Sequence, residues 1–259
     1  MSVFEEVKGI PRRVMTVFFL VDSSGSMEGD KIGSVNVAVR ETIPELREIA
    51  QKNSDAMIKM ACLEFATGVE WMYPEPLDVE SFEWRDLVAK GATSFGEACH
   101  ELNSKLSRSN GYMKNATGSY APVIILLSDG MPNDNWEREV ENLWKNNWFK
   151  YAIKIAVGIG RTEDNYQEVL GKFTKSSELV LTVKDRDTLK DLIRFVTVSS
   201  TQIQSSSSSV GKEAPASKEE EFSETLKNGL ETNEDLKKVE IGVDAPATTE
   251  SDWSDSGWG

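Results

Sequence analysis

The chain has 259 residues, 39% of them hydrophobic, which is enough for one sizeable core and allows one or two domains. Its formal net charge of -14 opposes binding to phosphate backbones and to anionic membrane surfaces, and no basic run is interleaved with aromatic residues. We therefore expect neither nucleic acid nor membrane as a partner.

The start of the chain predicts no export. Residues 1–13 lack the apolar core of a secretory signal, and the longest apolar stretch, residues 14–21, is less than half of what a bilayer requires. Cys62 and Cys99 both lie within apolar patterns, where a small buried thiol is expected rather than a disulfide. These features predict a cytoplasmic protein.

Apolar runs alternate with amphipathic stretches along most of the chain. Strands are predicted at residues 14–21, 57–65, 123–127, 152–159 and 179–183, with an antiparallel edge strand at 69–73. Helical spacing is found at residues 30–51, 95–107, 136–147, 164–173 and 186–198. Pro44 should kink or restart the first helix. The alternation predicts an α/β fold, a doubly wound, mostly parallel sheet with helices on both faces.

The composition changes near residue 204. From Ser205 to Gly259 there are 13 acidic residues against 5 basic ones, with little apolar surface, so we expect a globular domain over residues 14–203 and a disordered, Ser/Glu-rich tail over 204–259. Residues 222–230 could form a short amphipathic helix. Trp253 and Trp258 near the end are either partner anchors or incidental aromatics in a solvated tail.

Five oxygen-bearing residues follow predicted strands or begin a predicted helix. Asp22, Ser24 and Ser26 come after the first strand, Thr93 precedes the helix that begins at residue 95, and Asp129 follows the third long strand. Ligands of doubly wound sheets collect at the carboxyl ends of the strands, so these side chains should meet there. Two carboxylates and three hydroxyls favour Mg²⁺ or Mn²⁺, are less suited to Ca²⁺ and suit zinc poorly.

Each motif also has an ordinary structural explanation. SSGS and SDG are common turns, and Thr93 could be a helix N-cap. Gly25 allows a tight turn, and the following helix would direct its positive N-terminal end at the site. Asp129 adds a second carboxylate and leaves a coordination position for an outside ligand. Together, in this order, the motifs predict a metal site.

This arrangement resembles the von Willebrand factor type A (VWA) domain and its metal-ion-dependent adhesion site, with the pattern D-x-S-x-S, then a distant Thr, then a distant Asp. The resemblance implies that the two serines and either Thr93 or Asp129 hold the metal, and that a partner's Asp or Glu completes the coordination. It also implies movement of the last helix, residues 186–198. The strings DSSGSM, GATSFGEA and LLSDGMPNDNWE look most like small bacterial members associated with tellurite resistance and chemical stress.

Further residues have two interpretations each. Asn133 and Asp134 could contact a ligand or a water next to the metal, or they could be turn residues. Trp136, Trp144 and Trp148 follow helical spacing, which is typical of helix packing. The single histidine, His100, is expected to be structural.

We expect a non-enzymatic scaffold that recognises a partner carboxylate through a metal. The resemblance implies a phosphorylation circuit with a protein kinase and a protein phosphatase as partners, with Thr248 and Thr249 as possible phosphorylation sites. One alternative is a Mg²⁺-dependent phosphohydrolase, although the D-x-D motif of haloacid dehalogenase-like enzymes is absent because Ser24 stands at its third position. Another is a VWA subunit of an AAA-type ATPase or chelatase assembly.

Overall fold

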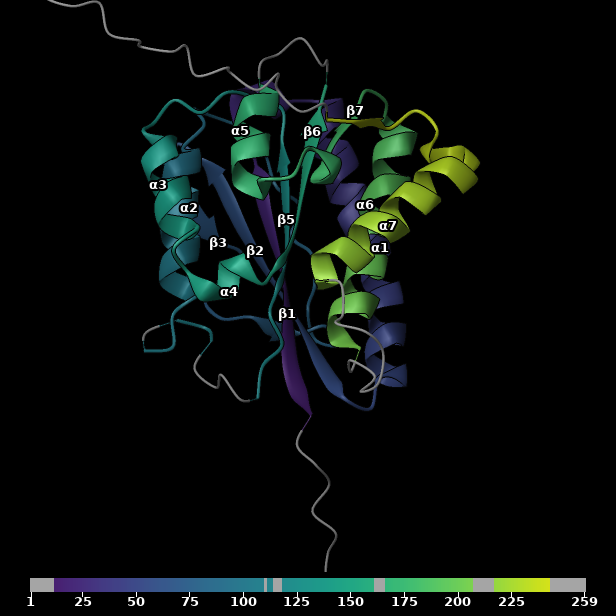
Figure 1. Ribbon diagram of the computed structural model, residues 1–259. Coiled ribbons are helices and arrows are strands. Elements are labelled where there is room, and N and C mark those ends of the chain that lie inside the picture. The colour runs from purple at the N-terminus through teal and green to yellow at the C-terminus, as the bar shows by residue number, and fades with distance from the viewer. Residues whose placement is uncertain (1–11, 110, 114–117, 161–165, 207–216, 243–259) are drawn as a thin grey trace, which may run out of the picture.

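The computed structural model describes residues 12–109, 111–113, 118–160, 166–206 and 217–242 (Figure 1). The strands are β1 (Arg13–Asp22), β2 (Ala56–Ala66), β3 (Gly68–Trp71), β4 (Leu77–Asp78), β5 (Val123–Ser128), β6 (Ile153–Ile159), β7 (Val180–Val183) and β8 (Glu240–Ile241). The α-helices are α1 (Asp30–Lys52), α2 (Phe95–Lys105), α3 (Trp136–Leu143), α4 (Asn147–Lys150), α5 (Tyr166–Thr174), α6 (Arg186–Ser205) and α7 (Lys218–Thr232). Short 3-10 turns are η1 (Gly25–Met27), η2 (Ser177–Leu179) and η3 (Glu234–Leu236).

These strands form one mixed sheet in the order β3-β2-β1-β5-β6-β7-β8, with β4 also paired to β2. The pairs β2–β1, β1–β5, β5–β6 and β6–β7 are parallel, while β3, β4 and β8 pair antiparallel at the edges. The predicted doubly wound, mostly parallel fold and the antiparallel edge strand at residues 69–73 are therefore confirmed.

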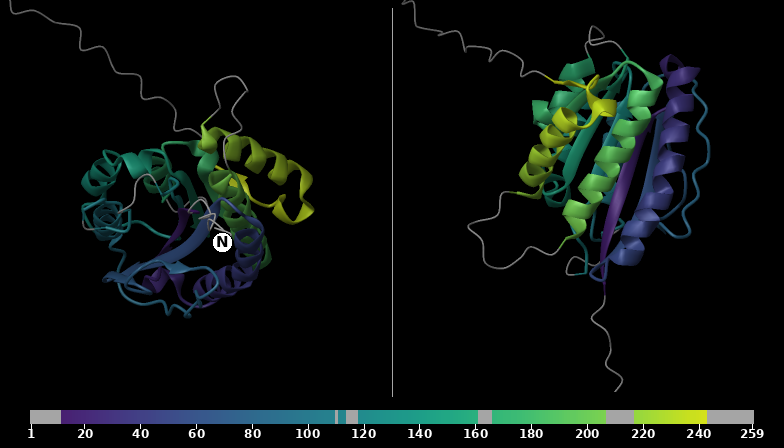
Figure 2. Two further views of the ribbon diagram at one scale, coloured as in Figure 1. Left: turned by 90° about the horizontal axis from the view of Figure 1, so that it is seen from below. Right: turned by 90° about the vertical axis from the view of Figure 1, so that its right-hand side faces the viewer.

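Helices cover both faces of the sheet (Figures 1 and 2). In β1, Val17 and Phe19 belong to the core shared with α1, α6 and α7, whereas Phe18 and Leu20 belong to the core shared with α2, α3 and α5. Side chains alternate between the faces of a strand, so a central strand covered on both sides must be apolar throughout. This explains why the sequence of β1 is a continuous apolar run.

The first helix runs without a break from Asp30 to Lys52, so a restart of the helix at Pro44 is wrong. Proline removes one backbone donor, but α1 continues to Lys52. Val39, Ile43 and Leu46, on either side of the proline, are all buried in the core. This packing offsets the lost hydrogen bond.

The helix predicted at residues 136–147 ends earlier, at Leu143, and a separate short helix, α4, begins at Asn147. The side chain of Asn146 accepts a hydrogen bond from the backbone N–H of Trp148 at 2.9 Å and so caps α4. Its amide also donates to Asn103 Oδ1 at 2.9 Å, which ties the break to α2. Capping by Asn146 therefore starts a new helix within an otherwise periodic pattern.

The last predicted helix ends later than expected, at Ser205 rather than residue 198. Its added turns bury the polar residues Ser200, Thr201 and Gln204. Ser200 donates to the carbonyl of Val196, and Gln204 donates to the carbonyl of Ala121 at 2.8 Å. Because such buried polar residues break the apolar pattern, the sequence predicts a helix that is shorter than the observed one.

Residues 217–242 are folded, so the expectation of disorder is wrong for this part of the tail, while residues 207–216 and 243–259 lie outside the described residues. The helix expected at residues 222–230 is confirmed as α7. It starts with a capping box, in which Ser217 and Glu220 each bond the other's backbone N–H. We call residues 217–242 the C-terminal strap, because α7 lies alongside α6 (Figure 2).

The helices and the two cysteines each show one further feature. Within the described ranges, no helix is both long enough and apolar enough to cross a bilayer. Cys62 and Cys99 are both free and buried, as their apolar surroundings in the sequence predicted. They lie in different hydrophobic cores, so their role is packing.

Candidate metal site

The candidate site lies at the carboxyl edge of the sheet, where the strand order reverses. Strand β1 lies between β2 and β5 and runs parallel to both. Asp22 is the last residue of β1, and Asp129 directly follows β5. Adjacent parallel strands therefore bring the two predicted carboxylates to the same edge, at the position where open α/β sheets bind ligands.

Asp22 is fully buried and both of its carboxylate oxygens accept hydrogen bonds. The backbone N–H of Ser24 donates to Oδ1 at 2.9 Å, and the hydroxyl of Ser128 donates to Oδ2 at 2.6 Å. Burial raises the pKa of Asp22, and the charge of Asp129 adds to that rise, while the bonds from Ser128 and Ser24 oppose it. Asp22 thus orients the turn and places negative charge behind it.

Three further side chains form a connected set in front of Asp22. The hydroxyl oxygens of Ser24 and Ser26 are 3.0 Å apart, and Ser26 donates to Asp129 Oδ1 at 2.7 Å. Ser24 and Asp129 are buried, whereas Ser26 is exposed. The set is therefore accessible from outside at Ser26.

The loop that carries Thr93 lies against the turn after β1. Lys90 donates its backbone N–H to the carbonyl of Ser23 at 2.7 Å, and Gly25 donates to the carbonyl of Gly91 at 3.0 Å. Gly91 has a φ of +78°, and a Cβ there would lie 2.3 Å from Thr67 Oγ1. Only glycine fits at this position, and its tight conformation brings the loop to the edge of the sheet.

Asn133 holds Thr93 from the other side. The backbone N–H of Thr93 donates to Asn133 Oδ1 at 3.0 Å, and the backbone N–H of Asn133 donates to the carbonyl of Thr93 at 2.9 Å. Both bonds use backbone atoms of Thr93, so neither engages its hydroxyl. Ser94, not Thr93, is the N-cap of α2, which removes the capping explanation for the threonine.

Asp134 accepts hydrogen bonds at the start of α2. Its two carboxylate oxygens accept from the backbone N–H groups of Gly96 and Glu97, each at 3.0 Å. These groups form the N-terminal end of α2, where a negative charge is favourable. Asn133 and Asp134 together therefore attach the loop after β5 to the Thr93 loop, and Asp134 is engaged by α2.

Two residues of the site, Lys31 and Ser128, were not predicted from the sequence. Lys31 lies in the first turn of α1 and its ammonium is 2.5 Å from Asp129 Oδ2. The sequence does contain a signal for Lys31. The turn after Asp22 places the start of the following helix at the site, and Lys31 lies at that start. Ser128 precedes Asp129, and only the observed pairing of β1 with β5 shows that it reaches Asp22.

The donor set fits a hard divalent cation. Among the described residues, no group of three or more His, Cys, Asp or Glu side chains could hold a metal ion. A metal here would rely on Asp22 and Asp129 for charge and on Ser24, Ser26 and Thr93 for neutral oxygens. This mixture, with water as a further ligand, is typical of Mg²⁺ and Mn²⁺ sites.

The fold and the oxygen-rich edge define the class of open α/β domains that bind ligands where their strand order reverses. Residues 16–195 match the family model of the von Willebrand factor type A domain. The chain belongs to this family, which confirms the predicted VWA domain. Domains of this family often mediate metal-dependent protein interactions.

Solved structures show the same fold. The chain is 20% identical to a von Willebrand factor type A protein from Catenulispora acidiphila, with a TM-score of 0.51, covering 73% of this chain and 42% of that one. It is 17% identical to proximal thread matrix protein 1 from the mussel byssus, with a TM-score of 0.55, covering 74% and 49%. The mussel protein is described with zinc in its adhesion-site motif.

A curated relative also matches part of the chain. It is called Venom allergen 5, from Rhynchium brunneum, and is 32% identical over 144 residues. The match covers 52% of this chain and 58% of the relative. The chain thus spans less than two thirds of that relative and less than half of each of the two solved structures.

Proposed function

We propose that this chain is a non-enzymatic, metal-dependent protein-interaction module that binds an acidic side chain of a partner. The convergence of Ser24, Ser26 and Asp129 in front of the buried Asp22 supports this proposal most directly. The metal would be Mg²⁺ or Mn²⁺, held by the two serines and by either Thr93 or Asp129. When bound, it would supply a positive centre for a partner's carboxylate.

The division of roles follows from the hydrogen bonds. Asp22 has both oxygens engaged, so it would act through its charge and by orienting Ser24. Ser26 is exposed, which would let a carboxylate of another protein approach from solvent. The two neutral hydroxyls would leave the metal with enough residual charge to attract that carboxylate.

The proposed cellular role is a scaffold in a bacterial cytoplasmic stress response, with a protein kinase and a protein phosphatase as partners. The likeness of DSSGSM and LLSDGMPNDNWE to stress-associated bacterial members supports it. Thr248 and Thr249 are the proposed phosphorylation sites, and both lie outside the described residues. Mass spectrometry of the chain from stressed cells tests this role, and an absence of phosphate at both residues would count against it.

Calorimetric titration of the full chain with Mg²⁺, Mn²⁺ and Zn²⁺ tests the metal site. We expect saturable binding, with a higher affinity for Mg²⁺ or Mn²⁺ than for Zn²⁺, because zinc is poorly suited to a hydroxyl-rich set of ligands. Asp129→Ala should lower the affinity by about 100-fold or more. Glu28→Gln is the matched control, because this exposed acidic residue follows the Ser26 turn. Equal binding by the wild type and Asp129→Ala would refute the site.

Partner binding is tested separately. Immobilised full-length chain is exposed to a bacterial lysate in Mg²⁺ or in chelator, with immobilised Asp129→Ala as the control surface. We expect a protein retained only by the wild type with metal, and its retention should disappear when one Asp or Glu of that protein is replaced by Ala. Retention that persists in chelator would contradict a metal-bridged interaction.

A further inference from the structure

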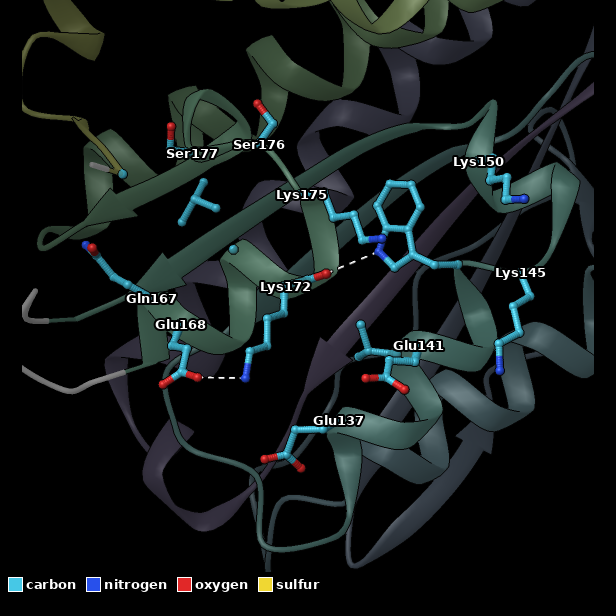
Figure 3. A pocket seen from close by; sticks show the side chains of 15 residues that line it. Glu137, Glu141, Lys145, Lys150, Gln167, Glu168, Lys172, Lys175, Ser176 and Ser177 are labelled. Carbon is cyan, nitrogen blue, oxygen red and sulfur yellow. Dashed lines mark hydrogen bonds and ion pairs between the residues drawn. The ribbon is translucent and has the colours of Figure 1, made fainter. Parts of the chain in front are cut away.

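A groove lies between α3 and α5 and shares no lining residue with the metal site (Figure 3). Its volume is about 1240 Å³, which is large enough for a peptide segment. Val140, Trp144 and Val180 provide an apolar lining. Four lysines border it, so we call it the lysine groove: Lys145, Lys150, Lys172 and Lys175.

Three of these lysines have no acidic partner in the part of the chain that the structure describes. Lys172 forms an ion pair with Glu168 at 2.7 Å, but Lys145, Lys150 and Lys175 form none within 4.0 Å. In Figure 3, Lys145 and Lys150 lie together on the side of the groove away from Glu168. Glu137 and Glu141 also line the groove, but neither forms an ion pair with these three lysines, so this side offers ammonium groups without a direct acidic partner among the described residues.

Trp144 links the charge to the apolar lining. Its indole N–H donates to the carbonyls of Lys172 and Phe173, each at 3.1 Å, which fixes the ring at the groove. The ammonium of Lys175 lies 4.5 Å from the ring centre, and that of the buried Lys154 lies 4.9 Å away. An incoming segment would thus meet an aromatic surface next to positive charge.

Lys175 occupies an unusual backbone position. It follows the end of α5 with a φ of +54°, in the left-handed region where glycine is the ordinary residue after a helix. For a residue with a side chain, this conformation carries an energetic cost. The side chain that incurs this cost directs its ammonium over Trp144.

The chain itself carries a segment with complementary chemistry. Gly242 lines the groove, and its backbone N–H donates to the carbonyl of Val180 at 2.7 Å. The 17 residues that follow, 243–259, contain four acidic residues and no Lys or Arg. They also contain two large aromatic residues, Trp253 and Trp258.

We propose that the lysine groove binds the chain's own residues 243–259, through their carboxylates and tryptophans. The acidic residues would pair with Lys145, Lys150 and Lys175, and a tryptophan would pack on Val140 and Trp144. Tryptophan next to acidic residues matches an apolar surface bordered by lysines. This proposal concerns a separate surface and does not depend on the metal site.

Chain connectivity favours this occupant over an acidic segment of another protein. The eleven peptide units that join Gly242 to Trp253 can span up to about 36 Å, whereas an eight-residue helix such as α3 is about 12 Å long. A tethered segment has an effective concentration on the order of millimolar. A separate partner would have to compete with that concentration.

The test is carbodiimide cross-linking of the full-length chain, which joins carboxylates to nearby amines, followed by peptide mass mapping. A mixture of ¹⁴N- and ¹⁵N-labelled protein distinguishes links within one chain from links between copies. We expect Glu250, Asp252 or Asp255 to join groove lysines within one chain, and to do so more than exposed Lys52 on α1.

Lys175→Gly provides a variant that should fold, because glycine suits the positive φ at this position. It removes one ammonium and should lower the links to Lys150 by roughly five-fold. Trp253→Ala with Trp258→Ala should lower them too, although neither change alters a reacting group. Lys52→Gln is the control and should leave the links unchanged.

Two outcomes would overturn the proposal. Groove lysines that link no more often than Lys52 would show that residues 243–259 do not bind there. Links found only between differently labelled copies would assign the groove to a second molecule.

Discussion

The proposed metal site and the C-terminal strap are built in opposite ways. At the proposed metal site, short motifs at the ends of β1 and β5 provide a few polar side chains, and their hydroxyls and carboxylates bond directly to one another. The strap is a single segment of polar composition whose few apolar residues, among them Phe222 and Leu226, are buried against the rest of the domain. A site made of a few characteristic residue types can be recognised from short stretches of sequence. The stability of a polar helix depends instead on a surface formed by residues far away in the sequence.

The largest effect on stability is expected from truncating a side chain with which the strap packs on the core. Phe222 is fully buried, so Phe222→Ala should lower the free energy of unfolding by about 3 kcal/mol. Urea unfolding followed by tryptophan fluorescence measures this loss. Glu224→Ala, at an exposed position of the same helix, is the control. A loss below about 1 kcal/mol would mean that the strap contributes little to stability.

A buried ion pair provides the second test of the strap. Lys154 on β6 is fully buried and lies 3.0 Å from Glu219 on α7. Burial lowers the pKa of Lys154, and Glu219 partly opposes that effect. Glu219→Leu should therefore cost about 2 kcal/mol of stability, because it leaves a buried ammonium without its acidic partner.

The double variant Lys154→Met/Glu219→Leu separates pairing from packing. Removing both charges should recover most of the stability that Glu219→Leu loses, since apolar replacements of a buried pair are often neutral. The same urea titration applies. A double variant as unstable as Glu219→Leu would show that the pair's other bonds, such as those from Lys154 to the carbonyls of Phe149 and Ala152, matter more.

At the metal site, Ser128→Ala should weaken divalent-metal binding by about ten-fold, because Asp22 loses the hydroxyl that orients its Oδ2. Calorimetry measures the change. Ser23→Ala is a matched control, since this neighbouring buried serine donates to Glu64 at 2.6 Å instead. Equal losses in the two variants would mean that the turn as a whole, not the orientation of Asp22, determines affinity.

A smaller and opposite effect is expected at Lys31. Its ammonium lies 2.5 Å from Asp129 Oδ2, where it would compete with a bound metal for the same carboxylate. Lys31→Met should strengthen metal binding by about two- to five-fold, and Lys31→Arg should leave it nearly unchanged. Weaker binding by Lys31→Met would instead show that the lysine holds Asp129 in place for the metal.

The smallest predicted effect is a pH dependence of the strap. Hydrogen bonds from Lys227 and Ser223 on α7 lower the pKa of Glu178 from its ordinary value of 4.5. The contribution to stability is therefore fully present above pH 4.5 and is lost as the pH falls through the lower folded pKa. Amide hydrogen exchange in α7 between pH 5 and 3 should show this loss.

Glu178→Gln tests the cause of that dependence. The variant removes the titrating group, so the opening free energy of α7 should change less between pH 5 and 3 than in the wild type. The glutamate is partly exposed, and the difference should be a fraction of a kcal/mol. An identical pH profile in both proteins would assign the dependence to other acidic residues.

The parallel sheet could be predicted because strands such as β1 and β5 are apolar on both faces. The cluster of Asp22, Ser24 and Asp129 could be predicted because strand ends meet at one edge. The bond from Ser128 to Asp22 could not, since it depends on which strands are neighbours. Tertiary packing likewise determines the continuity of α1 through Pro44.

The strap also bears on which fragment of this protein can be studied in isolation. The family match ends at residue 195, within α6, where Phe195 packs so closely on Gly229 of α7 that an added Cβ would lie 2.2 Å from its ring. A fragment cut at the family boundary would shorten α6, uncover this ring and leave Lys154 without Glu219. A fragment expressed as a stably folded domain should therefore include every residue through Gly242.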